Sequence, residues 1–149
     1  MKISASKSEL KGTVTVPGSK SHTIRALLLA AMSDGVCTIS NPLPSEDCLS
    51  TCRALPLIGA SVEGADKQGS SSWTVHGAGA KLHLPSDVVN VGNSGSLLYF
   101  LSPIAATFNG WSVFTGDESI RKRPVHHVVD ALNQLGAKSY TAIPGRSPG

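Results

Sequence analysis

A Gly/Ser-rich stretch near the N-terminus could bind a phosphate or a carboxylate. Residues 17–25 (PGSKSHTIR) lead into an apolar segment that is typical of a helix. The N–H groups at a helix start have no carbonyl partner and carry partial positive charge, which favours an anion there. Lys20 adds a full charge, and Arg25 adds a forked set of donors one turn later. An ordinary capped helix with a solvated lysine explains the same residues. The Walker A loop is disfavoured, because Ser19 and Val14 stand where that loop has glycines.

A second stretch, residues 92–96 (GNSGS), has two glycines that would let a ligand approach the backbone closely. Its N–H groups would also lie at the start of a helix, where an anion is favoured. Taken alone, the same residues are typical of a simple turn. The stretch is matched to the Lys20 loop by the internal repeat described below, and that match favours a binding role.

Three consecutive cations, Arg121, Lys122 and Arg123, stand out in a chain with only 15% charged residues. Such runs are usually solvated. A nucleic acid partner is disfavoured, because no aromatic residues alternate with the cations and the net charge is only +3. A small, multiply charged anion bound by Lys20, Arg25 and Arg123 fits the pattern better.

The composition indicates a globular chain of 149 residues with 40% hydrophobic residues. No membrane contact is predicted, since the longest apolar run, residues 26–32, is too short to cross a bilayer. The three cysteines favour a reducing, cytoplasmic compartment over a disulfide framework. Cys48 and Cys52 are spaced like two metal ligands on a helix, but no second ligand pair matches them, so they are predicted to be core residues. We predict no metal and no other cofactor.

The chain contains an internal repeat. At an offset of 75, the Lys20 loop falls on residues 90–96, and Gly35 falls on Gly110. At an offset of 77, residues 54–60 fall on residues 131–137. Each half is therefore predicted to contain a strand, a Gly/Ser loop, an apolar helix, a second strand, a polar loop, a second helix and a final strand. This order is typical of an α/β domain.

Hydrophobic periodicity gives the individual elements. Helices are predicted over residues 24–33, 47–58 and 125–135, the last two ending at a glycine. Residues 70–76 and 81–84 are predicted to form a short hairpin, because glycines separate two strand-like runs.

Taken together, these motifs resemble those of the 5-enolpyruvylshikimate-3-phosphate synthase family. They occur in the family's order: Val16 to Ser21 followed by Arg25 to Ala31, then Ser45 to Asp47, Gly92 to Gly95, Thr115 to Asp117, Lys122 to Pro124 and Asp130 to Leu132. The sister family of UDP-N-acetylglucosamine enolpyruvyl transferases resembles the chain less, because its loop has Lys-Asn where this chain has Lys20-Ser21.

The resemblance implies transfer of the enolpyruvyl group from phosphoenolpyruvate to the 5-hydroxyl of shikimate 3-phosphate, with release of phosphate, in aromatic amino acid biosynthesis. It implies six substrate-binding residues: Lys20 for both substrates, Ser21 and Arg25 for shikimate 3-phosphate, and Asn93, Gly95 and Arg123 for phosphoenolpyruvate. It assigns no catalytic residue to this chain.

The resemblance also implies the family's inside-out α/β fold, in which each of two domains is built from three βαβαββ-type units. This chain is expected to be part of the N-terminal domain, with unit one at about 14–85, unit two at about 86–142 and a loop or tail at 143–149. The C-terminal domain, which supplies acid/base groups in the family, is expected to be a missing partner, so the chain alone would bind substrates without turnover.

Two departures from the family pattern lie in the second loop and its helix. Ser96 replaces the usual threonine, and Tyr99 replaces the usual arginine. Two alternatives remain open: a stand-alone phosphate- or carboxylate-binding module, and half of a split synthase.

Overall fold

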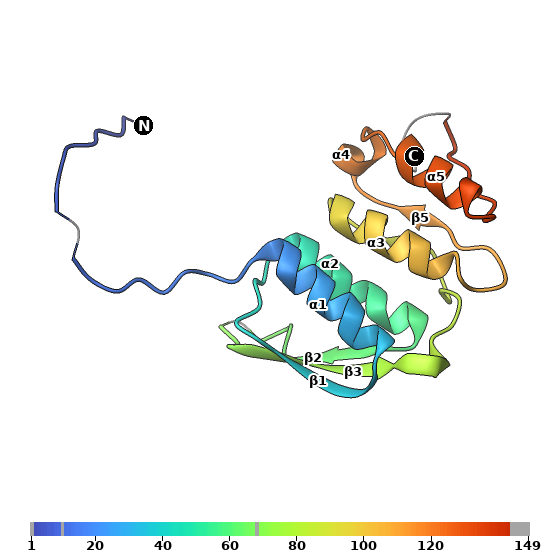
Figure 1. Cartoon of the computed structure of the whole chain (residues 1–149), viewed down its shortest axis with the longest axis horizontal. Helices are drawn as coiled ribbons and strands as arrows, with labels where there is room; N and C mark the ends of the chain where they lie inside the picture. Colours follow the sequence, from blue (N-terminus) through green and yellow to red (C-terminus); the bar gives the residue numbers. More distant parts are fainter. Residues whose placement is uncertain (1, 10, 68, 144–149) are drawn as a thin grey trace.

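Residues 2–9 and 11–19 form no helix or strand. The computed structural model describes residues 2–9, 11–67 and 69–143. The residues up to Ser19 include no helix or strand in the described part and extend away from the body of the molecule (Figure 1). The expected strand before Gly18 is therefore wrong. The side chains of Val14 and Val16 are exposed, and no described strand lies beside them to accept their backbone hydrogen bonds.

Two helices begin the folded body. Helix α1 (Lys20–Met32) is capped by Ser19, whose side chain accepts a hydrogen bond from the His22 N–H. Helix α2 (Glu46–Ala54) continues into a short 3₁₀ helix, η1 (Leu55–Ile58). The α-helix stops there because Pro56 has no N–H to donate, and Gly59 ends the segment at φ +99°.

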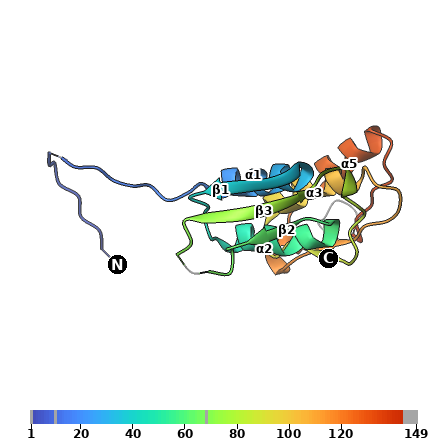
Figure 2. The same cartoon turned by 90° about the horizontal axis from the view of Figure 1, so that it is seen from below.

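Three antiparallel strands cover these helices on one side (Figure 2). Strand β3 (Ser72–Ala78) lies in the middle, between β1 (Asp34–Ser40) and β2 (Ser61–Glu63). The predicted hairpin between residues 70–76 and 81–84 is wrong. Both edges of β3 are already paired, so no edge is left for a following strand, and Gly79–Lys81 instead form a 3₁₀ turn, η2.

The second half repeats this order in shorter form. Strand β4 (Val89–Asn90) pairs in parallel with β5 (Phe114–Thr115), and α3 (Gly95–Ala105) connects them. Two further helices follow, α4 (Glu118–Arg121) and α5 (His126–Gln134). Ser94 caps α3 as Ser19 caps α1, and these two residues are 75 positions apart.

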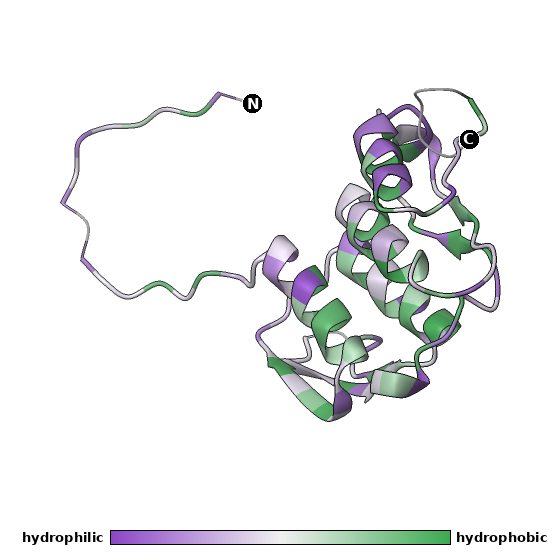
Figure 3. Cartoon of the chain, turned by 45° about the vertical axis from the view of Figure 1, so that its right-hand side comes forward, coloured by the Kyte–Doolittle hydropathy of each residue, from purple (hydrophilic) through white to green (hydrophobic). Residues whose placement is uncertain are grey.

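The core lies where α1, α2 and α3 pack together over the sheet. Its largest fully buried side chains include Trp73, Ile24, Leu27, Leu97 and Leu101. Polar residues gather instead in the segment of α4 and α5, at the top of Figure 3. Among the described helices, none combines the length and apolar character that a membrane span requires.

Candidate functional site

Lys20 is the first residue of α1, and an acidic residue from α2 holds its side chain. The Lys20 Nζ lies 3.0 Å from Asp47 Oδ2. Asp47 is mostly buried, with 14% of its side chain exposed, whereas 48% of the Lys20 side chain is exposed. The contact therefore fixes the direction of the lysine while one side of the ammonium group stays open to a ligand.

Ser21 and Arg25 lie on the exposed surface of the first turns of α1. Arg25 Nε donates a hydrogen bond to the Ser21 carbonyl oxygen at 3.0 Å. This bond uses one donor of the guanidinium group and leaves its two terminal amino groups available to an anion near Ser21.

The second predicted loop brings Gly95 and Arg123 together. Gly95 is the first residue of α3, and the Ser94 hydroxyl accepts a hydrogen bond from the Leu97 N–H at 3.2 Å. A Cβ atom added at Gly95 would lie only 2.9 Å from Arg123 Nη1. The guanidinium group thus occupies the space over the first amides of α3, which have no helical carbonyl to bond. Asn93 is exposed in the turn directly before the cap.

Helix α2 connects the two loops, which are far apart in the sequence. Its first turn carries Asp47, which pairs with Lys20, and Cys48, whose thiol donates to the Lys20 carbonyl oxygen at 3.7 Å. One turn further, the Ser50 hydroxyl lies against Gly92, at 2.8 Å from where a Cβ would stand. Gly92 itself has φ +58°, which a glycine adopts without strain. Both loops therefore rest on the N-terminal half of α2.

The third stretch, residues 115–123, joins the second loop through Asp117. The Asp117 N–H donates to the Gly92 carbonyl oxygen at 2.8 Å. The Asp117 carboxylate caps α4 by accepting from the N–H groups of Ile120 and Ser119 and from the Ser119 hydroxyl. The bond from the Ile120 N–H contributes most to lowering the pKa of Asp117 below 3.8. This cap directs the chain so that Arg123 returns to Gly95.

The positive charges differ in how far protein groups neutralise them. Lys122 pairs with Glu118, and Lys20 pairs with Asp47. Within residues 11–67 and 69–143, no carboxylate lies within 4.0 Å of the cationic nitrogens of Arg25 or Arg123. Among the predicted substrate-binding residues, these two arginines therefore have no carboxylate partner in the described part of the chain, whereas Lys20 has one.

Three contacts of the site escaped the sequence analysis. In the sequence, Asp47 stands out only as part of the motif at residues 45–47, and nothing singles out Ser50. Tyr99 donates its hydroxyl to the Pro124 carbonyl oxygen at 3.0 Å, directly after Arg123. Tyr99 thus anchors the backbone next to Arg123. The acidic first turn of α2 was the one signal that could have indicated a partner for Lys20.

The two cysteines predicted to lie in the core do so. Cys48 is fully buried and Cys52 half-buried. Burial raises the pKa of Cys48, and it raises that of Cys52 to about 12, so neither thiol is poised as a nucleophile. In the part of the chain that the structure describes, no three His, Cys, Asp or Glu side chains gather as metal ligands.

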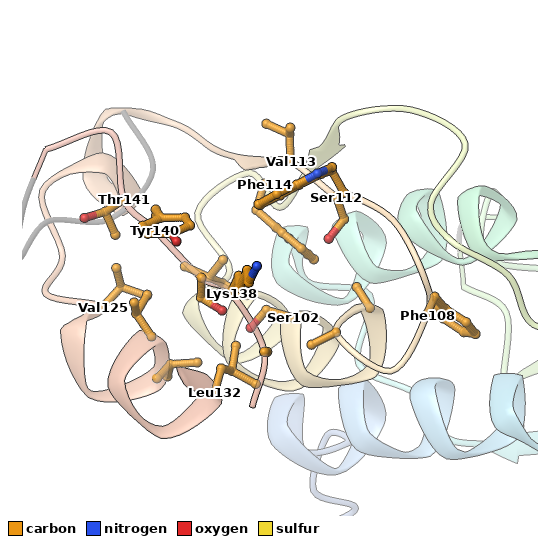
Figure 4. A pocket seen from close by; sticks show the side chains of 18 of the residues that line it. Ser102, Phe108, Ser112, Val113, Phe114, Val125, Leu132, Lys138, Tyr140 and Thr141 are labelled. Carbon is orange, nitrogen blue, oxygen red and sulfur yellow. The ribbon is translucent and has the colours of Figure 1, made fainter. Parts of the chain in front are cut away.

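A cleft of about 660 Å³ lies elsewhere, between α3, α5 and the segments next to β5 (Figure 4). None of the six predicted substrate-binding residues lines it. The candidate anion site is instead formed by the two loops that rest on α2 and by residues 115–123, which join the second loop. Its cations and helix-start amides are groups that favour anions.

Comparisons with known proteins identify the family to which the chain is similar. Residues 5–142 match the family described as EPSP synthase (3-phosphoshikimate 1-carboxyvinyltransferase). The chain is 44% identical over 149 residues to the 3-phosphoshikimate 1-carboxyvinyltransferase of Acetivibrio thermocellus, covering 99% of this chain and 34% of that protein. It is 41% identical over 143 residues to that of Methanothermobacter thermautotrophicus, covering 95% of this chain and 33% of that protein.

The structural comparison gives the same result. The solved EPSP synthase from Acinetobacter baumannii superposes with a TM-score of 0.83 at 33% identity, over 92% of this chain and 31% of that one. The predicted α/β enolpyruvyl transferase fold is thereby confirmed for the part it covers. The chain spans about a third of the length of these relatives. It belongs to the EPSP synthase (3-phosphoshikimate 1-carboxyvinyltransferase) family.

Proposed function

We propose that this chain is the substrate-binding N-terminal portion of a synthase that transfers the enolpyruvyl group of phosphoenolpyruvate to the 5-hydroxyl of shikimate 3-phosphate. In this reaction the hydroxyl oxygen forms a bond to the enolpyruvyl carbon, the carbon–oxygen bond to phosphate breaks, and phosphate leaves with the hydroxyl proton. The chain alone binds the substrates without turnover and acts together with a C-terminal domain in the reducing cytoplasm.

The observation that carries the proposal is the position of Arg123 over Gly95 at the start of α3. Phosphoenolpyruvate carries a phosphate and a carboxylate, which need a forked donor and a row of free amides. The guanidinium of Arg123 supplies the forked donor. The backbone amides of the turn at Gly95 supply the row of free N–H groups, and Asn93 lies beside them.

The Lys20 loop offers a second anion site. Ser21 and Arg25 stand at the start of α1, where the phosphate of shikimate 3-phosphate would meet the hydroxyl, the helix-start amides and the guanidinium. Lys20 is tied to α2, the helix on which both loops rest, so it is placed to contact both substrates. This portion contributes to catalysis by holding the two substrates side by side, so that the entropy cost of bringing them together is met on binding.

A generic anion-binding module is the second candidate. It is favoured by the fact that both loops are serine-capped helix starts, which bind phosphate of any origin. Inorganic phosphate would then bind as well as either substrate.

Reconstitution tests the proposal. The chain is mixed with the part of the Acetivibrio thermocellus relative that follows the matched third, and phosphate release from both substrates is measured. We expect release from the mixture and none from either part alone. Arg123→Gln should abolish the release, whereas Arg121→Gln, which changes an exposed cation two residues earlier in the chain, should leave it unchanged. Release by the chain alone, or full activity with Arg123→Gln, would contradict the proposal.

A further inference from the structure

The side chain of Arg123 reaches its place over α3 without help from an acidic partner. Within the described residues, no carboxylate lies within 4.0 Å of its guanidinium nitrogens. The guanidinium nevertheless lies against Gly95, at the first turn of α3. Its position therefore depends chiefly on the backbone from which the side chain extends.

The backbone that leads into Arg123 is held by hydrogen bonds. The Arg123 N–H donates to the Ile120 carbonyl oxygen at 2.9 Å, and the Asp117 N–H donates to the Gly92 carbonyl oxygen at 2.8 Å. The backbone that follows Arg123 differs, because Pro124 has no N–H to donate and α5 begins only at His126. The side of Arg123 toward α5 thus needs a tie of another kind.

Tyr99 supplies this tie from α3. It stands four residues after Gly95, and residues with this spacing share one face of a helix. Its hydroxyl donates to the Pro124 carbonyl oxygen at 3.0 Å. Pro124 directly follows Arg123, so the backbone of Arg123 is tied to the same helix whose first amides its guanidinium covers.

The ring of Tyr99 is itself held by a neighbouring ring. His127, in the first turn of α5, lies edge-on to it, with ring centroids 5.1 Å apart and planes at 76°. This edge-to-face arrangement is a favourable one for aromatic rings. It restricts the few torsions of the tyrosine side chain, so the hydroxyl stays directed at Pro124.

Two roles for Tyr99 lead to different outcomes. A plain link between α3 and α5 would affect stability and would leave the place of the guanidinium unchanged. A positioning role would affect the part of the site that contains Arg123, whereas Ser21 and Arg25, which lie on α1, would keep their ligand.

We propose that Tyr99 is a positioning residue for Arg123. Its hydroxyl, directed by the ring of His127, holds the Pro124 carbonyl and thereby keeps the guanidinium over the first amides of α3. The affinity of this half of the site for an anion that carries a phosphate and a carboxylate depends on that placement. The identity of the ligand rests on the proposed function, whereas the position of Arg123 can be measured without any ligand.

Tyr99→Phe tests the placement in the ligand-free chain, because it removes the hydroxyl and keeps the ring. The probe is the nuclear Overhauser effect between the α protons of Gly95 and the δ protons of Arg123, whose Cδ lies 3.9 Å from where a Gly95 Cβ would stand. The matched control is Tyr140→Phe, at the other of the two tyrosines, which is 76% exposed. We expect the signal in the wild type and the control, and its loss in Tyr99→Phe.

Calorimetric titration tests the consequence for binding. Tyr99→Phe should raise the dissociation constant of phosphoenolpyruvate about three- to tenfold, the range for one lost hydrogen bond. It should leave the dissociation constant of shikimate 3-phosphate at the value of the control. In a chain that already carries Arg123→Gln, Tyr99→Phe should weaken phosphoenolpyruvate no further.

The two measurements separate failure of this inference from failure of the proposed function. A Gly95–Arg123 signal that persists in Tyr99→Phe would overturn the positioning role, and so would an equal loss of affinity for both substrates. A wild-type chain that shows the signal but binds no phosphoenolpyruvate would overturn the proposed function, and with it the role of this placement in binding that substrate.

Discussion

At the scale of single residues, the site depends on one glycine that makes room for one arginine. Lys20 and Gly95 are equivalent in the repeat, each being the first residue of an apolar helix after a serine cap. In the first unit the residue itself brings the positive charge. In the second unit, Gly95 has no side chain, so the guanidinium of Arg123 reaches the helix start and brings the positive charge there. The two helix starts thus acquire a cation in two different ways.

Gly95→Ala tests this arrangement. The added Cβ would lie 2.9 Å from Arg123 Nη1, the far end of a flexible side chain, so the guanidinium moves while the backbone stays. We expect the stability to change by less than about 0.5 kcal/mol. The affinity for phosphoenolpyruvate should fall about tenfold, as when a hydrogen bond to a charged group is lost. Calorimetric titration measures the affinity, and urea unfolding measures the stability.

A double variant sharpens the same test. If Gly95→Ala acts by displacing Arg123, it adds no further loss of affinity in a chain that already carries Arg123→Gln. Losses that multiply in the double variant would show that the two residues act separately, and the contact would then have no functional role.

Asp117 gives a residue-scale prediction about pH. Its folded pKa is lowered, chiefly by the Ile120 N–H, so its contribution to stability is complete above 3.8 and is lost as the pH falls through the lower folded value. Asp117→Asn keeps a capping oxygen but does not titrate. The stability advantage of the wild type over Asp117→Asn should shrink as the pH falls from about 5 to about 3. Urea unfolding at each pH measures it, and an advantage that stays constant over this range would contradict the assignment.

At the scale of elements, the sequence predicts what depends on near neighbours. The presence of α1, the end of η1 at Gly59 and the end of α5 before Gly136 follow from local periodicity and from glycines with positive φ. The start of α1 differs from the prediction, because the helix begins after the Ser19 cap, four residues before Ile24. The order of β1, β3 and β2 could not be predicted, because strand pairing joins residues far apart in the chain. Residues 81–84 have a strand-like sequence, but β3, the strand directly before them, is already paired on both edges.

The packing of β3 on α1 depends on Gly77. A Cβ at this position would collide with the carbonyl oxygens of Ala30 and Ser33, which are backbone atoms at the end of α1. Strand propensity alone predicts that Gly77→Ala stabilises the protein. The contact predicts the opposite, a loss of about 1–3 kcal/mol in the free energy of unfolding, as for other overpacked sites.

Urea unfolding decides between the two. Ser72→Ala, at the start of the same strand, is the matched control and should change the stability by less than about 0.5 kcal/mol. A Gly77→Ala variant as stable as this control would show that the helix and the strand can move apart at no cost.

At the scale of the whole molecule, the site is a product of tertiary structure. The sequence supplied three candidate loops and the resemblance that grouped their residues. The sequence does not predict that both loops pack against α2, because the contacts of Asp47 with Lys20 and of Ser50 with Gly92 join segments that are far apart in the chain. It also gave no sign that Tyr99 would anchor the backbone beside Arg123. The central claim is that these loops form one site with two substrate-specific halves.

An NMR titration of the isotope-labelled chain tests that claim most directly. Shikimate 3-phosphate is expected to shift the amide signals of Lys20, Ser21 and Arg25, and phosphoenolpyruvate those of Asn93 and Gly95. Inorganic phosphate at the same concentration should produce much smaller shifts, because it lacks the groups that the loops hold jointly. Equal shifts with inorganic phosphate, or shifts confined to residues outside the three loops, would contradict the account.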